Sequence, residues 1–189
     1  MNRVFLILII LFIFISASQA NIYIDINGAL TQTVDAENQI GGGGAVLYDI
    51  HRDINVFFKT IINTRILHYN SNDQVQYEYY MNLAGMEYQY NINNIPLFWK
   101  FSIAMGFGNV NIDFKDNTKE DSNDSGFCMA AWTGLKYVVT QHLCPFIDIG
   151  IHKSLFTKEL KNSNIMGAQI LVGLRITVYG KNRSILSDY

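Results

Sequence analysis

The fold is decided by the segment Ile165–Tyr179, which reads IMGAQILVGLRITVY. Apolar side chains occupy every second position of this segment: Met166, Ala168, Ile170, Val172, Leu174, Ile176 and Val178. The positions between them include Gly167, Gln169, Gly173, Arg175 and Thr177. Because successive side chains of a β-strand point to opposite faces, the segment predicts a strand with one apolar and one polar face.

Seven earlier segments show the same alternation. With the last one, the expected strands lie at about 22–31, 44–51, 55–67, 75–90, 97–108, 126–138, 144–155 and 165–179. Alternating segments of about ten residues, separated by polar connections, are typical of transmembrane β-barrels. The predicted fold class is therefore all-β, an eight-stranded antiparallel up-and-down transmembrane β-barrel.

The first twenty residues have the pattern of a secretory signal peptide. Asn2 and Arg3 precede an apolar run, Val4–Ile15, and small residues follow at Ser18 and Ala20. The run is shorter than the ~20 residues of a spanning helix, so cleavage before Asn21 is favoured over an uncleaved anchor. The expected organisation is a signal peptide at 1–20, an outer-membrane barrel at 21–179 and a short periplasmic tail at 180–189.

Composition excludes one class of partner and agrees with long strands. The formal charge is -2 and 16% of the residues are charged, so no basic field for nucleic acid is present. Eleven Tyr, twelve Phe and only two Pro fit uninterrupted strands with aromatic ends.

The connections are alternately long and short, which predicts an orientation. An up-and-down barrel has short periplasmic turns and longer extracellular loops. Here the long polar connections include 31–43 and 109–125, the loops expected to meet an extracellular ligand. Gly41–Gly44 lacks the Gly-Lys-Ser/Thr of a phosphate-binding loop and is expected to be a flexible entry into the second strand.

A soluble secreted barrel of the lipocalin type is the structural alternative, with the apolar face turned inward. Its outer surface would be rich in Lys and Glu. The polar face here consists mostly of Gly, Ala, Ser, Asn and Tyr, with about one or two charges in each strand. Small residues of this kind fit a narrow interior, so the membrane barrel is favoured.

The inward face is predicted to hold a polar network in the lumen. Its expected members are Asp25, Asp49, Glu78 and Asp148, with Lys59, Arg65, Lys100, Lys136 and Arg175. Charges in a confined space must be paired or hydrated, and these are nearly balanced. Glu87 and Gln89 interrupt the alternation of the fourth strand, and a β-bulge near Gly85 is expected to turn them inward.

An eight-stranded barrel is only wide enough for its own side chains, so an open aqueous pore is not expected. Aromatic residues near the strand ends are expected to form interfacial girdles. They are Tyr48, Tyr77, Trp99, Phe107, Phe127, Tyr137 and Tyr179.

At the level of this pattern, the mature chain resembles the small eight-stranded outer-membrane proteins of the OmpA/OmpX kind. The resemblance implies a terminal-strand signal for the barrel assembly machinery, carried by Gly173, Ile176, Val178 and Tyr179. Leu171 departs from the pattern because a polar residue is usual there, and the chain continues past the strand. The ten-residue tail is too short to be a peptidoglycan-binding domain.

Candidate chemistry is limited to one face of the seventh strand. Asp148, His152 and Ser154 share that face, and the His152-Lys153-Ser154 triplet is similar to the His-x-Ser of outer-membrane lipid A deacylases, with Glu159 as the acidic partner. Residues two apart on a strand are separated by about 6.6 Å, which does not by itself make a Ser–His hydrogen bond. Polar lumen residues are the favoured interpretation.

No cofactor or metal site is expected, because the other histidines are scattered over connections at both ends. Cys128 and Cys144 are expected to lie about 30 Å apart in the sixth and seventh strands, far beyond disulfide range. The favoured function is that of a monomeric, non-enzymatic outer-membrane protein, surrounded by lipid, whose loops contact surfaces, host molecules or phage. The lipid-modifying hydrolase and the soluble ligand-binding barrel stay open as alternatives.

Overall fold

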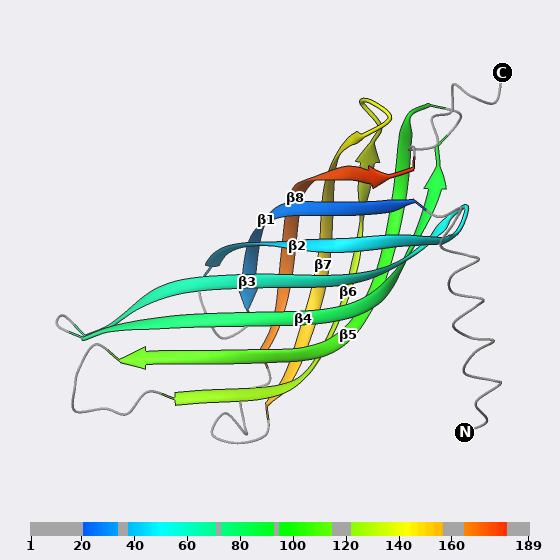
Figure 1. Ribbon diagram of the computed structural model, residues 1–189. Helices are drawn as coiled ribbons and strands as arrows, with labels where there is room; N and C mark the ends of the chain where they lie inside the picture. The colour runs from blue at the N-terminus through cyan, green and yellow to red at the C-terminus, as the bar shows by residue number, and fades with distance from the viewer. Residues whose placement is uncertain are drawn as a thin grey trace, which may run out of the picture.

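A computed structural model of the protein describes residues 21–33, 38–70, 73–92, 95–114, 122–156 and 165–180. These residues form a closed barrel in which each strand pairs antiparallel with its neighbours in sequence, and β8 closes on β1 (Figure 1). The strands are β1 (Ile22–Thr33), β2 (Asn38–His51), β3 (Ile54–Asn70), β4 (Asp73–Asn91), β5 (Leu97–Phe114), β6 (Ser122–Tyr137), β7 (Leu143–Phe156) and β8 (Ile165–Tyr179). The predicted all-β, eight-stranded fold is confirmed. The expected signal peptide at 1–20 and almost all of the expected tail lie outside the described residues.

The faces are oriented as a membrane barrel requires. Trp99, Phe101 and Ile170 are 46%, 44% and 41% exposed, whereas Asp25 and Arg175 are 2% and 0% exposed. The apolar face therefore points outward and the polar face points into the lumen. This is the opposite of the lipocalin arrangement, which places its apolar side chains inside.

The stagger of the strands explains the strong tilt seen in Figure 1. A path through directly paired residues starts at Ile22, passes through every strand and returns to β1 at Gln32, ten residues further on (32 minus 22). In a closed sheet, such a displacement requires tilted strands, and with eight strands the interior is just filled by side chains.

Several inward-facing glycines are required by close approach between strands. A Cβ atom on Gly43 would lie 2.1 Å from the backbone oxygen of Thr60, and one on Gly134 would lie 2.1 Å from that of Ile147. The expectation that Gly41–Gly44 is a flexible entry was wrong, because all four residues pair within β2.

Most strands are longer than the alternation predicted. β2 begins at Asn38 rather than near residue 44, and β5 continues to Phe114 rather than ending near 108. Of the expected loops 31–43 and 109–125, only 34–37 and 115–121 lie between strands, and both segments are outside the described residues. Apolar alternation marks the part of a strand that faces lipid, whereas backbone pairing continues beyond it.

The phase of β4 corrects a second expectation. Glu87 is 3% exposed and its pairing partners on β3 and β5 follow without a break through Gly85, so no bulge is present there. The inward positions of β4 are instead Tyr79, Met81, Leu83 and Glu87. The assignment failed because this strand has apolar side chains on both faces, which hides its period.

Candidate functional site: a charged network inside the barrel

Arg175 of β8 is the centre of a buried ionic network. Its Nε and Nη2 atoms donate to the two carboxylate oxygens of Asp25 at 2.7 and 2.8 Å. Its Nη1 and Nη2 atoms donate to Glu87 at 2.6 and 2.9 Å. Asp25 is the direct cross-strand neighbour of Arg175 on β1, whereas Glu87 comes from β4 across the lumen. One fully buried guanidinium thus holds two carboxylates in paired hydrogen bonds, the strongest geometry available to arginine.

Lys100 of β5 extends the network to β7. Its Nζ lies 3.0 Å from Asp148 Oδ2 on β7 and 3.4 Å from Glu87 Oε2. The ammonium group also lies 4.2 Å from the ring centroid of Phe146. Cation–π contacts of this kind are favourable where water is excluded. The two cations together connect β1, β4, β5, β7 and β8.

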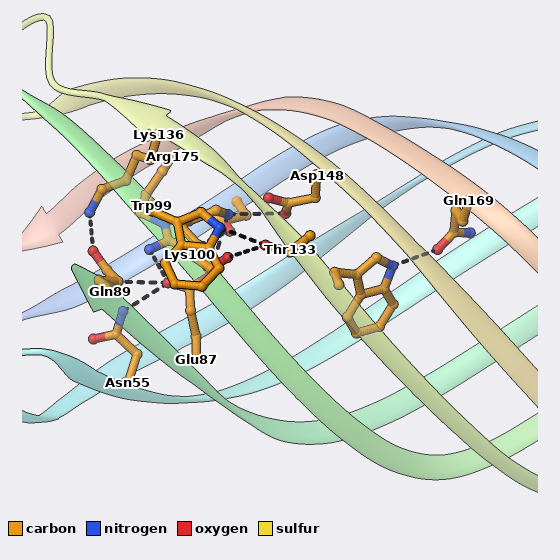
Figure 2. Close-up of polar contacts among 12 residues, drawn as sticks. Asn55, Glu87, Gln89, Trp99, Lys100, Thr133, Lys136, Asp148, Gln169 and Arg175 are labelled. Atoms are coloured by element: carbon orange, nitrogen blue, oxygen red, sulfur yellow. Dashed lines mark hydrogen bonds and ion pairs between the residues drawn. The ribbon is translucent and has the colours of Figure 1, made fainter. Parts of the chain in front are cut away.

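Amide side chains complete the coordination of Glu87, as Figure 2 shows. Its Oε1 accepts hydrogen bonds from Asn55 Nδ2 at 3.1 Å and Gln89 Nε2 at 2.8 Å. Lys136 in turn donates to Gln89 Oε1. A buried carboxylate is stable only when its oxygens are paired and hydrogen-bonded, and these partners meet that requirement.

The charges balance in the half of the lumen nearer the chain termini. Among the inward-facing side chains that the structure describes here, four carboxylates and four cations occur: Asp25, Asp49, Glu87 and Asp148 with Lys59, Lys100, Lys136 and Arg175. Lys59 is held between aromatic rings, with Nζ 4.6 Å from the Trp132 ring and 5.5 Å from the Phe57 ring. Asp49 accepts from Tyr23 Oη at 2.9 Å and Asn21 Nδ2 at 2.8 Å. The lumen is therefore filled without a large net charge.

A chain of neutral hydrogen bonds crosses the barrel beyond the ionic layer. Trp132 Nε1 donates to Gln169 Oε1, Gln169 Nε2 donates to Thr31 Oγ1, and Thr31 Oγ1 donates to Asn63 Oδ1, each at 3.0 Å. These four side chains come from β6, β8, β1 and β3 and are at most 2% exposed. They connect four further strand positions on the side of the barrel away from the chain termini.

Five of the nine predicted network residues join the network around Glu87 and Arg175. Asp49 and Lys59 lie in the lumen with the other partners described above, and Glu78 and Arg65 are exceptions. Asp25, Lys100, Asp148 and Arg175 share ion pairs with Glu87 or each other, and Lys136 joins through Gln89. Glu78 has the outward parity of Tyr80, whose hydroxyl donates to it, so its expected place in the lumen was wrong. Arg65 pairs with Tyr77 in the β3–β4 ladder, and its side chain lies outside the described part.

Glu87 is the residue that sequence reasoning undervalued. It binds both Arg175 and Lys100, yet a bulge was needed to bring it inside and it was absent from the expected network. The available signal was polar residues at two alternate positions, Glu87 and Gln89.

The hydrolytic alternative finds no catalytic geometry. Ser154 Oγ hydrogen-bonds to Tyr79 Oη, and neither nitrogen of His152 has a hydrogen-bond partner among the described residues. Both side chains are enclosed in the lumen, 0% and 1% exposed, rather than facing lipid. The third expected member, Glu159, lies outside the described residues.

Other expected sites are placed as follows. Cys128 and Cys144 form no disulfide, as predicted. Across the described ranges, no group of three or more His, Cys, Asp or Glu side chains is placed to share a metal ion. Of the expected assembly signal, Ile176, Val178 and Tyr179 face outward, whereas Gly173 faces the lumen beside Phe146. The signal itself stays a prediction.

At the end that carries the termini, aromatic side chains are exposed on three neighbouring strands, β4, β5 and β6. Tyr88, Tyr90, Trp99 and Tyr137 are each 45–56% exposed and lie next to the connections 92–96 and 138–142. Tyr88 and Tyr90 were missed because the phase of β4 was misread. Phe107 and Phe127, directly paired, are exposed nearer the opposite end. The side chain of Tyr77 lies outside the described part.

A closed eight-stranded barrel with an apolar exterior, aromatic ends and a charged interior defines the class of small transmembrane β-barrels. Among the residues that the structure describes, no helix is long and apolar enough to cross a bilayer.

Solved structures of this class share the fold. Neisserial surface protein A aligns with a TM-score of 0.59 and 14% identity over 83% of this chain and 96% of its own. The attachment invasion locus protein Ail of Yersinia pestis aligns with a TM-score of 0.55 and 16% identity over 84% and 97%. A major outer membrane protein from Thermus thermophilus gives 0.62 and 9% over 84% and 98%. No protein-family model and no curated protein sequence matches the chain. The resemblance to small eight-stranded outer-membrane barrels is confirmed for the fold.

Proposed function

We propose that this protein is an integral outer-membrane barrel that is closed to solutes and acts through its outer surface rather than as a pore or an enzyme. The observation that carries the proposal is the buried network around Arg175, which joins five of the eight strands across the lumen. Opening a path for solutes would require breaking these contacts.

Conductance measurements test the closed lumen. Purified protein that shows heat-modifiable migration is reconstituted into planar bilayers, and we expect insertion without steady conductance steps. The folded barrel is verified on the same preparation, so a silent bilayer is not confused with an unfolded protein. Reproducible unitary conductance from most insertions would contradict the proposal.

The outer surface is supported by a sheet that projects beyond the rest of the barrel. The ladder between β2 and β3 ends at Ile40 and Thr64, whereas the ladder between β3 and β4 continues to Asn70 and Asp73. On the other side, β6 and β7 pair as far as Gly126 and Phe156, whereas β5 and β6 pair as far as Ile112 and Ser122. In Figure 1 the ends of β3–β6 accordingly extend past those of β1, β2, β7 and β8.

A projecting sheet suits contact with another protein. Its edge strand β3 carries backbone groups past Thr64 that lie beyond the ladder with β2, and such edges bind extended segments by strand addition. Ail was solved in complex with a heparin analogue. A polyanion is not the ligand proposed for this chain, because positions 113–121 carry Asp113, Asp116, Glu120 and Asp121 against Lys115 and Lys119.

Surface binding is tested with the outer end of the β3–β4 hairpin, which carries the β3 edge. Cells that display the protein are compared with cells in which residues 66–76 are replaced by a short Gly-Ser turn, using immobilised fibronectin, laminin and fluorescent heparin as probes. We expect the change to reduce binding to a protein probe, with no heparin binding by either form. Equal binding of both forms to every probe, at equal amounts of folded barrel, would contradict the role of this surface.

A further inference from the structure

A groove of about 450 Å³ lies on the outward face of the barrel, from β6 across β7, β8 and β1 to β2. Leu30, Gln32, Asn38, Ile151, Ala168 and Ile170 are among its lining residues. Its size is within the range of about 300–1,000 Å³ for small-molecule sites. The groove lies on the surface that faces lipid, so it differs from the network inside the lumen.

The groove exists because one small residue stands among large ones. Ala168 pairs directly with Gln32 on β1 and Ile151 on β7. One outward row further along, Ile170 pairs with Leu30 and Ile149. A methyl group between longer side chains leaves a depression that crosses these rows.

The chemistry of the groove changes along its length. Leu30, Ile151 and Ile170 are 46%, 55% and 41% exposed and make its walls apolar. At the outer end, Gln32 and Asn38 pair across the β1–β2 ladder and are both exposed. An apolar groove with amide groups at its outer end matches a lipid acyl chain attached to a polar headgroup.

Lys153 adds a positive charge beside this outer end. It lies two residues beyond Ile151 on the same face of β7, opposite Met166, and three positions before β7 ends at Phe156. Within the strands, it is the only outward-facing Lys or Arg whose side chain the structure describes. A lysine near the end of a spanning segment extends its ammonium group to the headgroup level, where it attracts anionic lipid.

We propose that this groove binds one acyl chain of an anionic lipid of the outer leaflet whose headgroup carries a phosphate and a net negative charge. Lys153 contacts the phosphate, Gln32 and Asn38 hydrogen-bond to the polar groups next to the chain, and the chain lies over Ala168. The match between a single cation, a polar rim and an apolar trough favours an anionic lipid over a second copy of this protein. The inference rests on the membrane location proposed above.

Native mass spectrometry of the detergent-solubilised barrel tests the site. Phosphatidylglycerol and phosphatidylcholine with identical acyl chains are the probes. We expect one tightly retained lipid, with a preference of about fivefold for phosphatidylglycerol, the effect of one surface cation. Lys153→Gln should remove the headgroup preference and Lys153→Arg should keep it, because only the first change removes the charge.

Ala168→Phe should lower retention of both lipids by filling the groove, and Ala84→Phe is the matched control. Ala84 also faces outward, but on β4, between Phe58 and Met105. Equal retention by the two Phe variants would overturn the inference, as would displacement of the lipid by inorganic phosphate alone. A dimer that dissociates in Ala168→Phe would assign the groove to a second copy instead.

Different results would contradict the membrane location and the assignment of the groove to a lipid. If the wild-type protein needs no detergent and shows no heat-modifiable migration, the membrane location fails. If it behaves as a membrane barrel and its lipid retention ignores both Lys153 and Ala168, only the groove assignment fails.

Discussion

Arg175 shows how much of the fold depends on single buried contacts. Its side chain is 0% exposed and pairs with Asp25 and Glu87, so its removal leaves two carboxylates in a closed lumen. Breaking a buried pair from one side costs about 3–5 kcal/mol, because an uncompensated charge remains. The sequence predicted Arg175, Asp25, Lys100 and Asp148 as lumen residues from parity alone. It could not predict that Glu87 joins them, since that contact crosses the barrel from a strand whose phase is obscured by apolar residues on both faces.

We predict that Arg175→Gln lowers the free energy of unfolding by about 3 kcal/mol or more, measured by urea denaturation in lipid vesicles. Lys153→Gln, which removes an outward-facing charge, should change it by less than about 0.5 kcal/mol. The double variant Asp25→Asn with Arg175→Gln should cost less than the sum of its single changes, because the two residues share one interaction. Additive costs would mean that the ion pair contributes little.

Two glycines test the close packing between neighbouring strands. Gly43→Ala should destabilise the barrel by about 1–3 kcal/mol, because its Cβ would lie 2.1 Å from the Thr60 oxygen. Gly28→Ala is the control, since the nearest atom to a Cβ there is 4.0 Å away. Thermal unfolding followed by the shift from folded to unfolded migration compares them, and equal midpoints would refute the packing argument.

At the scale of the strands, sequence pattern and structure differ in an informative way. The boundaries of β8 were predicted correctly because nearly its whole length faces lipid. β2 and β5 were predicted too short for different reasons. The outer end of β2 carries Asn38, Gln39 and glycines and shows no apolar alternation, whereas in β5 the apolar positions change from odd numbers (Leu97 to Phe107) to even ones from Val110 onward. Backbone hydrogen bonds to neighbouring strands hold these ends in the sheet, and that pairing leaves no mark in the sequence of one strand.

The outward face of β8 can be tested with a charge. Val172 is 57% exposed in the middle of the strand, so Val172→Arg should cost about 2–4 kcal/mol of unfolding free energy in lipid vesicles. Val139 is 55% exposed but lies in the connection between β6 and β7, so Val139→Arg should be tolerated. Similar effects at the two sites would mean that β8 does not face hydrocarbon.

For the whole molecule, the alternation of side chains predicted the class of fold and an interior filled by side chains. It also predicted that the apolar face points outward and the polar face inward. It did not predict the partners within the lumen, because they depend on the ten-residue stagger that accumulates around the closed sheet. The same stagger brings Ala168, Gln32 and Ile151 into one row and so creates the outer groove. Both the lumen network and the outer groove therefore depend on how the sheet closes between β8 and β1.

The two tryptophans provide the most direct test of which face of the sheet contacts lipid. Trp99 is 46% exposed on the outward face, whereas Trp132 is 2% exposed inside the lumen. In vesicles that contain lipid brominated near the headgroup, the Trp132→Phe variant, which retains Trp99, should lose most of its fluorescence. The Trp99→Phe variant, which retains Trp132, should be quenched little. Strong quenching of Trp132 together with protection of Trp99 would contradict the central claim that hydrocarbon surrounds the barrel and the charged network fills it.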